Sequence, residues 1–406
     1  MTWHKLWTPR HPQPKPRRPR FRPQIEALED RQVPALIGTD LAIDFSTKPQ
    51  DHSAAAGSTN GASVVVWEDH FSASDTDISA RLTLADGTTS NLNVAFSTAN
   101  ERDPAVAMDR NGRFVVVWVE DVPGFLSSQG DIKAQRFNAD GTKRGGIITV
   151  AGTDRDETEP SVAMRDNGDF VVSLTLDLSG LFVANKDIRA RMFRFSDGAQ
   201  TAHIAVVSSA SIDRSSSVAR ADDGRFMVAF QTDGDIKLRR FSATGASLGA
   251  TITITHTTTT VRHPSVAVDN HFKGVVVWEQ VDSTHKIRSR TINASGSLNS
   301  NVVMAGSSQN QHSNPVVAMD RDATGFRFVV AFQTHPATSS GTSLDNHISL
   351  FEVTSTTLAP ALNAGDGVDA AIAVSGRTNG QSNYIVARTA LDSLNNPNIL
   401  GRLGSF

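Results

Sequence analysis

The chain of 406 residues contains no cysteine, a single tyrosine and no apolar run long enough to span a bilayer. The absence of cysteine excludes a disulfide framework and thiolate chemistry. Because no segment reads as a transmembrane helix, we expect no membrane span. Basic and acidic residues nearly balance, at 39 against 42, so the chain as a whole carries no large charge of one sign.

A phrase rich in Val and Phe repeats seven times, at intervals of about fifty residues. Its clearest copies are residues 103–118, 159–174 and 263–278. A second phrase follows each copy and begins with Asp-Ile in four of the seven units, as in Asp131-Ile132. A repeat of this length, broken by Asn-Gly turns, is typical of a β-propeller.

Each unit contains four strand-like runs separated by turns. In the second unit the runs are residues 105–108, 114–119, 132–137 and 147–150. Asn-Gly and Asp-Gly turns favour tight hairpins, so each unit is expected to form one blade of four antiparallel strands. The second run is apolar throughout, which requires cover on both faces. We therefore predict an all-β fold, a seven-bladed β-propeller of four-stranded antiparallel blades over residues 35–406.

We expect the last unit to have no fourth strand of its own, since only a few residues up to Phe406 follow its third run. Residues 39–45, ahead of the first unit, have the length and composition of a strand. We predict that this N-terminal segment pairs beside residues 399–403 and completes the last blade. Such pairing closes the ring and removes its open edge.

Residues 1–34 differ from the repeats and form a separate segment. Residues 1–23 hold seven basic residues and no acid, and prolines that include Pro12, Pro14, Pro16 and Pro19 interrupt them. A basic, Pro-rich arm cannot bury a core, and we expect it to be disordered. Such an arm can bind nucleic acid or anionic lipid. No base-stacking module accompanies it and the rest of the chain is acidic, so we expect no nucleic-acid partner.

The arm runs into a short motif made of Leu28, Glu29, Asp30 and Arg31, followed by Val33-Pro34-Ala35. This motif resembles the Leu-Glu-Asp/Pro-Arg type of N-terminal segment found on large exported or surface proteins of bacteria. The resemblance implies that these four are sorting residues and that the protein is extracellular or at the cell surface. No apolar stretch of about seven to fifteen residues follows the basic start, so we expect no ordinary signal peptide in these residues. The alternative is a linker with one short amphipathic turn.

The units themselves combine Pro-Ser-Val-Ala-Met-Asp, Asn-Gly, Phe-Val-Val-Val-Trp, Asp-Ile and Ala-Arg-Phe. They resemble propeller-type repeats that recur in bacterial surface proteins. The resemblance implies a fold and a location, and no reaction. Other propeller families fit less well, because the Gly-His and Trp-Asp pairs of WD repeats and the Ser-x-Asp-x-Gly-x-Thr-Trp box of sialidases are missing.

The candidate binding residues are of two kinds. Loops between the second and third runs carry apolar residues beside acids, with Phe125 and Phe182 at their tips. Exposed apolar tips favour a partner surface, although both side chains could instead fold back onto their own blades. An aspartate recurs before the third run, at Asp131, Asp187 and Asp235. These carboxylates either bind a partner or accept backbone N–H bonds where a turn enters the strand.

No metal, cofactor or catalytic residue is assigned from the sequence. A calcium site needs about six to eight oxygens. The segment 109–112 is too short for a calcium loop and the segment 320–322 stops at two carboxylates, so we interpret both as hairpin turns that cap their own backbone. No His-Glu-x-x-His or Gly-x-Ser-x-Gly motif is present. Blades can nevertheless bring distant carboxylates within the roughly 5–10 Å required for glycoside hydrolysis.

We therefore expect a secreted or cell-surface, non-enzymatic β-propeller, monomeric and without a cofactor. It binds a protein or carbohydrate partner through the face that carries the loops between strands two and three. On this hypothesis, replacing Phe125 and Phe182 by Ser abolishes partner capture and leaves the fold intact. The alternatives are a glycan-cleaving hydrolase with carboxylates at the channel mouth and a passive structural module of the cell envelope.

Overall fold

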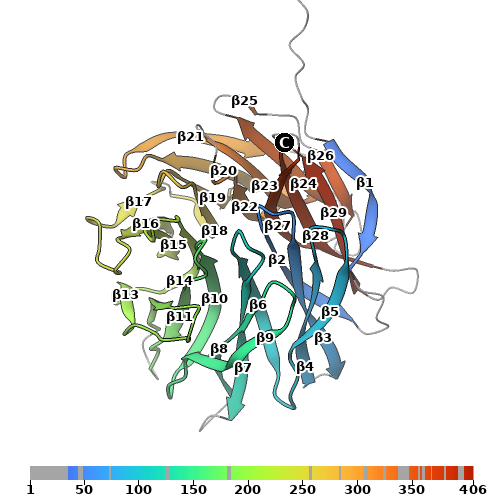
Figure 1. The fold of residues 1–406 in the computed structure, drawn as a ribbon. Helices are drawn as coiled ribbons and strands as arrows, with labels where there is room; N and C mark the ends of the chain where they lie inside the picture. Colours follow the sequence, from blue (N-terminus) through green and yellow to red (C-terminus); the bar gives the residue numbers. More distant parts are fainter. Residues whose placement is uncertain are drawn as a thin grey trace, which may run out of the picture. The chain divides into compact units, whose positions relative to one another are not determined.

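The protein is described by a computed structural model, shown in Figure 1. The described residues are 35–43, 49–72, 75–123, 128–180, 184–255, 258–282, 285–305, 310–322, 326–336, 347–354, 357–358, 362–366, 368–378, 381–391 and 397–405. The chain divides into Met1–Val33 and Pro34–Phe406, and every described residue lies in the second unit. These residues form strands and turns, and none belongs to a helix with the length and apolarity needed to cross a membrane.

Consecutive strands of the chain group into sheets. The first sheet contains β2 (Gln50–Gly57), β3 (Ser63–Ser72), β4 (Asp75–Thr83) and β5 (Thr89–Ala95). The second contains β6 (Glu101–Met108), β7 (Phe114–Pro123), β8 (Ser128–Phe137) and β9 (Lys143–Ala151). The third contains β10 (Asp156–Met164), β11 (Phe170–Asp177), β12 (Lys186–Phe193) and β13 (Ile204–Val207). The fourth contains β14 (Asp213–Arg220), β15 (Phe226–Thr232), β16 (Asp235–Phe241) and β17 (Ile252–Thr253).

The remaining sheets follow in chain order. The fifth contains β18 (Thr260–Val268), β19 (Gly274–Val281), β20 (His285–Ile292) and β21 (Leu298–Ala305). The next contains β22 (Asn310–Met319), β23 (Arg327–Pro336), β24 (His347–Thr354), β25 (Thr357–Leu358) and β26 (Leu362–Asp366). The last contains β27 (Val368–Thr378), β28 (Gln381–Leu391), β29 (Pro397–Ser405) and β1 (Ala35–Ala42).

The sheets are arranged as the blades of a propeller (Figure 1). Neighbouring strands within a sheet are antiparallel, and six of the sheets are four-stranded blades, as expected. The first strands β2, β6, β10, β14, β18, β22 and β27 contact one another in this order, and β27 contacts β2. First strands therefore surround the axis, and later strands lie progressively farther from it.

The expectation of four strands in every blade is wrong for the sheet that begins with β22. There, the short strands β25 and β26 both pair with β24, with Val353 opposite Leu358 and Leu350 opposite Leu362. The outer edge of this sheet is therefore shared by two segments. The sequence between them contains Pro360, which has no N–H to donate to a ladder and is disfavoured inside one.

The N-terminal strand β1 pairs antiparallel with β29. Leu41 lies opposite Gly401, and Ala42 lies opposite Leu400. Beyond the strand, the N–H of Ile43 donates to the carbonyl oxygen of Ile399 at 2.9 Å, and both of these side chains are buried. Segments from the two ends of the described unit thus share one sheet.

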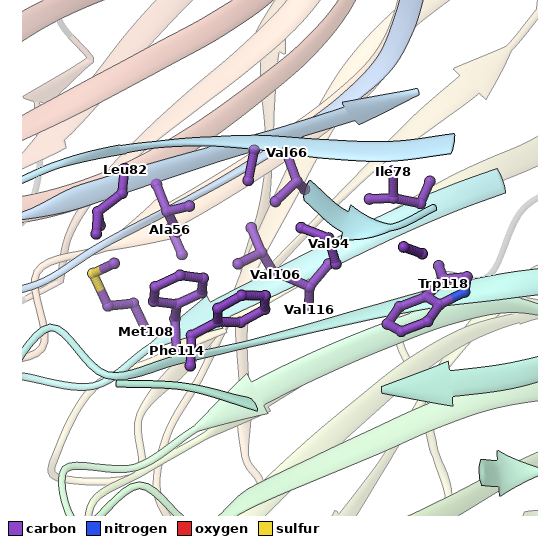
Figure 2. Packing of buried hydrophobic residues seen from close by; sticks show 14 of the residues in the cluster. Ala56, Val66, Ile78, Leu82, Val94, Val106, Met108, Phe114, Val116 and Trp118 are labelled. Carbon is purple, nitrogen blue, oxygen red and sulfur yellow. The ribbon is translucent and has the colours of Figure 1, made fainter. Parts of the chain in front are cut away.

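The second strand of each blade supplies the core. In β7, every side chain from residue 115 to 119 is fully buried. Val116 and Trp118 pack into a cluster with the first blade (Figure 2). On the other side of the strand, Val115 and Val117 pack with Phe170 of the third blade. A blade that lies between two neighbours is covered on both faces, which explains the continuous apolar run in its second strand.

Hairpin turns between first and second strands cap their own backbone. In the second blade, Gly112 has a φ of +83°, which glycine adopts without strain. Asp109 Oδ1 accepts hydrogen bonds from the backbone N–H groups of Asn111 (2.9 Å) and Arg113 (3.0 Å). The aspartate of this turn therefore serves the turn itself, as an Asx-type turn does.

Candidate functional site

Each described first strand has an irregular register where it begins, on the face that carries the linkers between blades and the loops between strands two and three. We call this face the loop face. The register shifts lie between Asp51 and Ala54, Arg102 and Ala105, Thr158 and Ser161, Arg214 and Ser217, Arg262 and Ser265, Ser313 and Val316, and Val368 and Ala371. Such β-bulges re-aim the side chains at their position and are common beside functional sites.

Six of these irregular segments contain a polar residue with a positive φ, between 48° and 53°. We call them the mouth residues: His52, Asp103, Glu159, Ser215, His263 and Asn314. Residues other than glycine rarely adopt this left-handed conformation, which costs on the order of 1–3 kcal/mol for each residue. Backbone strain of this kind persists where the surrounding structure imposes it, often at functional sites.

The mouth residues line an open cavity of about 430 Å³ on the loop face. The residues that follow them, such as Pro104 and Pro160, complete its wall. A second cavity, of about 240 Å³, lies at the opposite ends of the same first strands, against residues such as Gly57 and Met108. The two cavities therefore mark the two ends of the propeller axis.

Hydrogen bonds between blades fix the backbone of two mouth residues, Asp103 and Ser215. The backbone N–H of Asp103 donates to Glu68 Oε1, and that of Ser215 donates to Glu159 Oε2, each at 2.7 Å. Glu159 also accepts hydrogen bonds from Ser215 Oγ at 3.2 Å and from Thr175 Oγ1 at 2.7 Å. These bonds satisfy backbone donors at the points where the bulges interrupt the sheet ladders.

His52 belongs to a cluster of two histidines and two carboxylates in the first blade. His52 Nδ1 lies 3.1 Å from Asp51 Oδ1 and 3.3 Å from Glu68 Oε2, and His70 Nε2 lies 2.7 Å from Asp51 Oδ1. Hydrogen bonds to Asp51 and Glu68 raise the pKa of His52 to about 11. Burial raises the pKa of Asp51, but hydrogen bonds from His52 and His70 outweigh it and lower this pKa to about 2.

The fifth blade carries a related cluster that includes an arginine. Arg262 Nη2 donates to Glu279 Oε1 at 2.7 Å, and the Nδ1 atoms of His263 and His285 each lie 3.1 Å from an oxygen of Glu279. Burial raises the pKa of Glu279, but hydrogen bonds from His263 and Arg262 lower it to about 2. Glu279 is therefore ionised at neutral pH and has no proton to give as a general acid.

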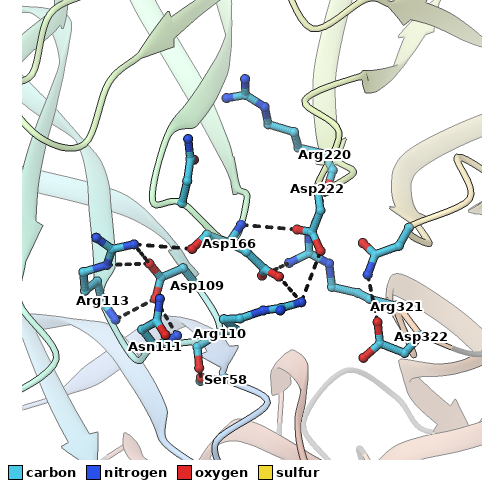
Figure 3. A network of polar contacts seen from close by, with 12 residues as sticks. Ser58, Asp109, Arg110, Asn111, Arg113, Asp166, Arg220, Asp222, Arg321 and Asp322 are labelled. Carbon is cyan, nitrogen blue, oxygen red and sulfur yellow. Dashed lines mark hydrogen bonds and ion pairs between the residues drawn. The ribbon is translucent and has the colours of Figure 1, made fainter.

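A network of two arginines and two aspartates lies at the opposite end of the axis, and three of its members, Arg110, Asp166 and Arg321, line the cavity there (Figure 3). Arg110 forms an ion pair with Asp166, and Arg321 Nη2 donates to Asp222 Oδ1 at 2.6 Å. The N–H of Asp166 also donates to Asp222 Oδ1, at 3.2 Å. Burial, together with the hydrogen bond to Asp222, raises the pKa of Asp166 to about 6. Because the four residues come from four blades, the network ties turns around the axis together.

The three acids that the sequence suggested as binding residues lie in the described part of the structure. Each accepts a hydrogen bond from a side chain of its own blade or of the linker that follows it. Asp187 Oδ2 accepts from Ser208 Oγ (2.9 Å), Asp235 Oδ1 from Thr255 Oγ1 (2.9 Å) and Asp131 Oδ2 from Lys133 Nζ (2.9 Å). None of the three lines either of the two axial cavities. Ser208 and Thr255 precede the next blade, so Asp187 and Asp235 hold the linkers between blades.

Phe125, Phe182, Leu28, Glu29, Asp30 and Arg31 lie outside the described residues. A different pair of phenylalanines is exposed on the loop face. Phe71, near the end of β3, is 41% exposed and Phe96, just after β5, is 67% exposed. Their rings meet edge to face with centroids 5.7 Å apart. An aromatic pair of this kind offers a contact surface for a partner.

Buried acids recur where the linkers enter the first strands. Ser97 Oγ donates to Glu101 Oε1 (2.6 Å), Thr153 Oγ1 to Glu157 Oε1 (2.6 Å) and Ser209 Oγ to Asp213 Oδ2 (2.8 Å). Burial raises the pKa of Glu101 to about 7, although the hydrogen bond from Ser97 opposes it, and burial also raises the pKa of Glu157. These acids stand at the starts of β6, β10 and β14 and do not line the mouth cavity.

Sequence reasoning did not single out the mouth residues. The available signal is a polar residue directly before the proline that opens four of the repeats, as in Asp103-Pro104 and Glu159-Pro160. Residue type alone gives no hint of the positive φ, because a residue before proline is expected to be extended.

No family model matches the chain, and no curated protein matches it in sequence. Solved structures do match it in fold. The α-L-arabinofuranosidase of family GH93 from Fusarium graminearum, in complex with arabinobiose, has a TM-score of 0.52 and 10% identity, covering 78% of this chain and 97% of that chain. A protein of unknown function from Dyadobacter fermentans has a TM-score of 0.51 and 9% identity, covering 92% of this chain and 100% of that chain.

A third similar structure is the α-L-arabinanase of Penicillium chrysogenum complexed with arabinobiose. Its TM-score is 0.50 and its identity is 11%, covering 90% of this chain and 97% of that chain. At these identities the likeness establishes the propeller fold and nothing about the reaction or the ligand.

Proposed function

We propose that this protein is an exported β-propeller that binds a carbohydrate in the mouth cavity of its loop face. One observation carries the proposal. Six blades each contribute one polar residue to the same cavity through the same backbone distortion. Because this distortion costs free energy in each of the six blades, its recurrence argues that the resulting arrangement of side chains is used.

The chemistry of the mouth suits a sugar. Each sugar hydroxyl both donates and accepts hydrogen bonds, and the mouth offers partners for both. Asp103 and Glu159 accept, Asn314 donates through its amide nitrogen, and Ser215 does either. The cavity of about 430 Å³ falls within the usual range for small-molecule sites, about 300–1,000 Å³.

The exposed pair Phe71 and Phe96 extends this surface beyond the cavity. Aromatic rings combine a large apolar area with a preferred packing geometry, and in this protein they lie on the same face as the mouth. We propose that they contact the apolar face of a sugar ring in a longer chain. The loop residues Phe125 and Phe182 stay candidates for the same role.

The comparisons help to choose the first ligand to test. Two of the structures with this fold contain arabinobiose. Their likeness to the present chain shows the fold alone and does not carry the proposal. It makes arabinobiose a reasonable first probe.

We propose binding and not hydrolysis, because the described carboxylates with a raised pKa do not line the mouth cavity. A glycosidase acid needs a raised pKa. Glu279, beside the mouth, has a pKa of about 2. The pKa values of Glu101 and Asp166 are raised, but Glu101 stands at the start of β6 outside the mouth cavity and Asp166 lies at the opposite cavity.

We also propose how the ring is completed and where the protein acts. In this interpretation the ring has seven blades, with the five-stranded sheet counted as one of them, and β1 closes it beside β29. The continuous cycle of contacts between first strands and the pairing of Leu41 with Gly401 support closure. The resemblance of residues 28–31 to a bacterial sorting segment supports a location outside the cytoplasm.

Calorimetric titration of the full chain with arabinobiose tests the binding proposal, and a glycan array extends it to other oligosaccharides. The variants Asp103→Asn and Glu159→Gln keep the shape of the mouth and remove a charged acceptor. Since a hydrogen bond to a charged group contributes about 1.5–3 kcal/mol, each should weaken binding at least about tenfold. Asp140→Asn, in an exposed hairpin at the other end of a blade, is the matched control and should bind as the wild type does.

Two results would count against the proposal. One is the absence of any bound oligosaccharide on the array, and the other is unchanged affinity in both mouth variants. Release of reducing sugar from the probe would move the conclusion to hydrolysis.

A further inference from the structure

We infer that Asp51, His52 and Glu68 form a binding site for a divalent transition-metal ion, with zinc as the first candidate. Each residue offers one ligand atom, and the three atoms lie within 4.8 Å of one another. The site lies at the rim of the mouth cavity, because His52 lines that cavity. The inference concerns the metal ion alone and goes beyond the proposed carbohydrate function.

The sheet register places two acids directly opposite each other at this site. Asp51 of β2 pairs with Glu68 of β3, and like charges in such positions are destabilising unless a cation compensates them. The equivalent pairs in the next five blades are Arg102 with Val119, Thr158 with Thr175, Arg214 with Gln231, Arg262 with Glu279, and Ser313 with Gln333. Among these six pairs, the one in the first blade alone joins two acids.

Within the described residues, the ion pairs of Asp51 and Glu68 are with His52 and His70, and none involves a lysine or arginine. Neutral imidazole and carboxylate oxygens are both metal ligands. Two ionised carboxylates with one neutral imidazole carry a charge of about −2, which a divalent cation balances when it displaces the imidazole proton.

The distances suit a metal site. Zinc bonds to nitrogen and oxygen of about 2.0–2.1 Å place the ligand atoms of a tetrahedral site about 3.3 Å apart. His52 Nδ1 lies 3.1 Å from Asp51 Oδ1 and 3.3 Å from Glu68 Oε2. A protonated imidazole held by two carboxylates has similar distances. Titration with metal distinguishes this metal-free arrangement from a site that binds zinc.

The surrounding groups orient the ligands as is usual around a metal. Glu68 is buried, and its Oε1 accepts the N–H of Asp103, which leaves Oε2 for the site. His70 Nε2 lies 2.7 Å from Asp51 Oδ1, and Thr76 Oγ1 lies 3.1 Å from His70 Nδ1. The side chain of His52 is 54% exposed, so the site is open to solvent and has room for a further ligand.

The fifth blade shows how this fold neutralises the same glutamate without a metal. Glu279 occupies the position of Glu68, and Arg262 occupies that of Asp51. The guanidinium of Arg262 donates to Glu279 at 2.7 Å, so a fixed positive charge compensates the buried carboxylate. In the first blade that position holds a second acid instead, so among the described residues the compensating charge is either a proton on His52 or His70 or a bound cation.

The mixed donor set indicates the class of metal. Imidazole suits zinc and other transition metals, whereas calcium and magnesium prefer oxygen ligands alone. We therefore expect zinc to bind more tightly than calcium or magnesium and its affinity to depend on the imidazole of His52. Manganese, which accepts both ligand types, is the second candidate.

The test is a calorimetric titration of the full chain, freed of metal by a chelator and returned to chelator-free buffer, with zinc chloride. Manganese, calcium and magnesium chlorides are titrated in parallel. We expect a zinc site of unit stoichiometry that is at least about tenfold weaker in His52→Asn and Glu68→Gln. Asparagine tolerates the left-handed conformation, so His52→Asn removes the imidazole at little backbone cost.

His263→Asn is the matched control, because His263 has nearly the same φ as His52 (51° against 48°) and belongs to the cluster that contains Arg262. It should bind zinc as the wild type does. Circular dichroism without metal establishes that each variant folds, and Asp51→Asn replaces Glu68→Gln if the latter does not.

Three results would overturn the inference. They are the absence of stoichiometric zinc or manganese binding by the wild type, equal zinc affinity in His52→Asn, and a calcium or magnesium site that survives loss of the imidazole. No sugar is present in this titration, so its failure leaves the carbohydrate proposal standing, and the converse also holds.

Discussion

The backbone N–H of Ser215 donates to Glu159 Oε2 at 2.7 Å, across the boundary between the third and fourth blades. Both residues have a positive φ and both line the mouth cavity. The N–H of Asp103 makes the same kind of bond to Glu68, between the first and second blades. The mouth is therefore built from contacts that also join neighbouring blades, so substitutions there affect stability as well as binding.

Glu159→Ala should lower the free energy of unfolding by about 1–3 kcal/mol, because it leaves the N–H of Ser215 without its acceptor. Glu159→Gln keeps an acceptor and should lose less. Urea unfolding of the three proteins measures the difference. Equal stability of Glu159→Ala and the wild type would show that the bond between the blades contributes nothing.

Trp118→Ala should cost about 3–5 kcal/mol, because the indole is fully buried between the first and second blades. Phe96→Ala is the control, since its ring is 67% exposed, and it should change stability by less than about 0.5 kcal/mol. The midpoints of denaturant unfolding measure both effects, provided that the unfolding free energies of all three proteins depend equally steeply on denaturant concentration. A small loss for Trp118→Ala would contradict the packing of these two blades.

Glu101 should make the protein more stable in mild acid than in mild base. Burial raises its pKa from the ordinary value of 4.5 to about 7, so the folded protein binds this proton more tightly than the unfolded chain does. The contribution of Glu101 is fully present below pH 4.5 and is lost as the pH rises through 7.

Glu101→Gln imitates the protonated acid and should remove this dependence. The variant should gain stability relative to the wild type as the pH rises from about 4 to about 8. Denaturant midpoints measured across this range provide the comparison. Parallel pH profiles for the two proteins would mean that Glu101 titrates normally.

Removing β1 should destabilise the propeller if this strand closes the ring. A chain that starts at residue 43 loses the pairing with β29 and should unfold at least about 5 °C below the full chain. A chain that starts at residue 35 retains β1 and is the control. Calorimetric scans of the three proteins test closure, and identical transitions would argue that β1 is dispensable.

The repeat and the four-stranded blade could be predicted from the sequence because both depend on local patterns. Hairpin glycines such as Gly112 and the apolar run around Val116 report on the turn and the burial of their own segment. The fifth strand beside β24 was not predicted, since an interrupted outer strand has no distinct period.

The candidate site was harder to predict, because contacts distant in sequence determine it. The left-handed conformation of Asp103 depends on Glu68 in another blade, and no pattern around Asp103-Pro104 shows this. Asp51 lies opposite Glu68 only because the register of β2 and β3 shifts at a bulge between Asp51 and Ala54, and the sequence does not reveal this shift. Asp187 and Asp235 were placed correctly at the start of the third strand, but residue type did not separate a linker contact from a binding role.

Hydrogen-exchange mass spectrometry of the full chain, with and without saturating arabinobiose, tests the proposed binding mouth most directly. We expect slower exchange in peptides that contain the starts of β2, β6, β10 and β14, and no change in the hairpins around Gly112 and Gly168. Unchanged exchange throughout the chain, or protection confined to the hairpin end of the axis, would show that the mouth does not bind this sugar.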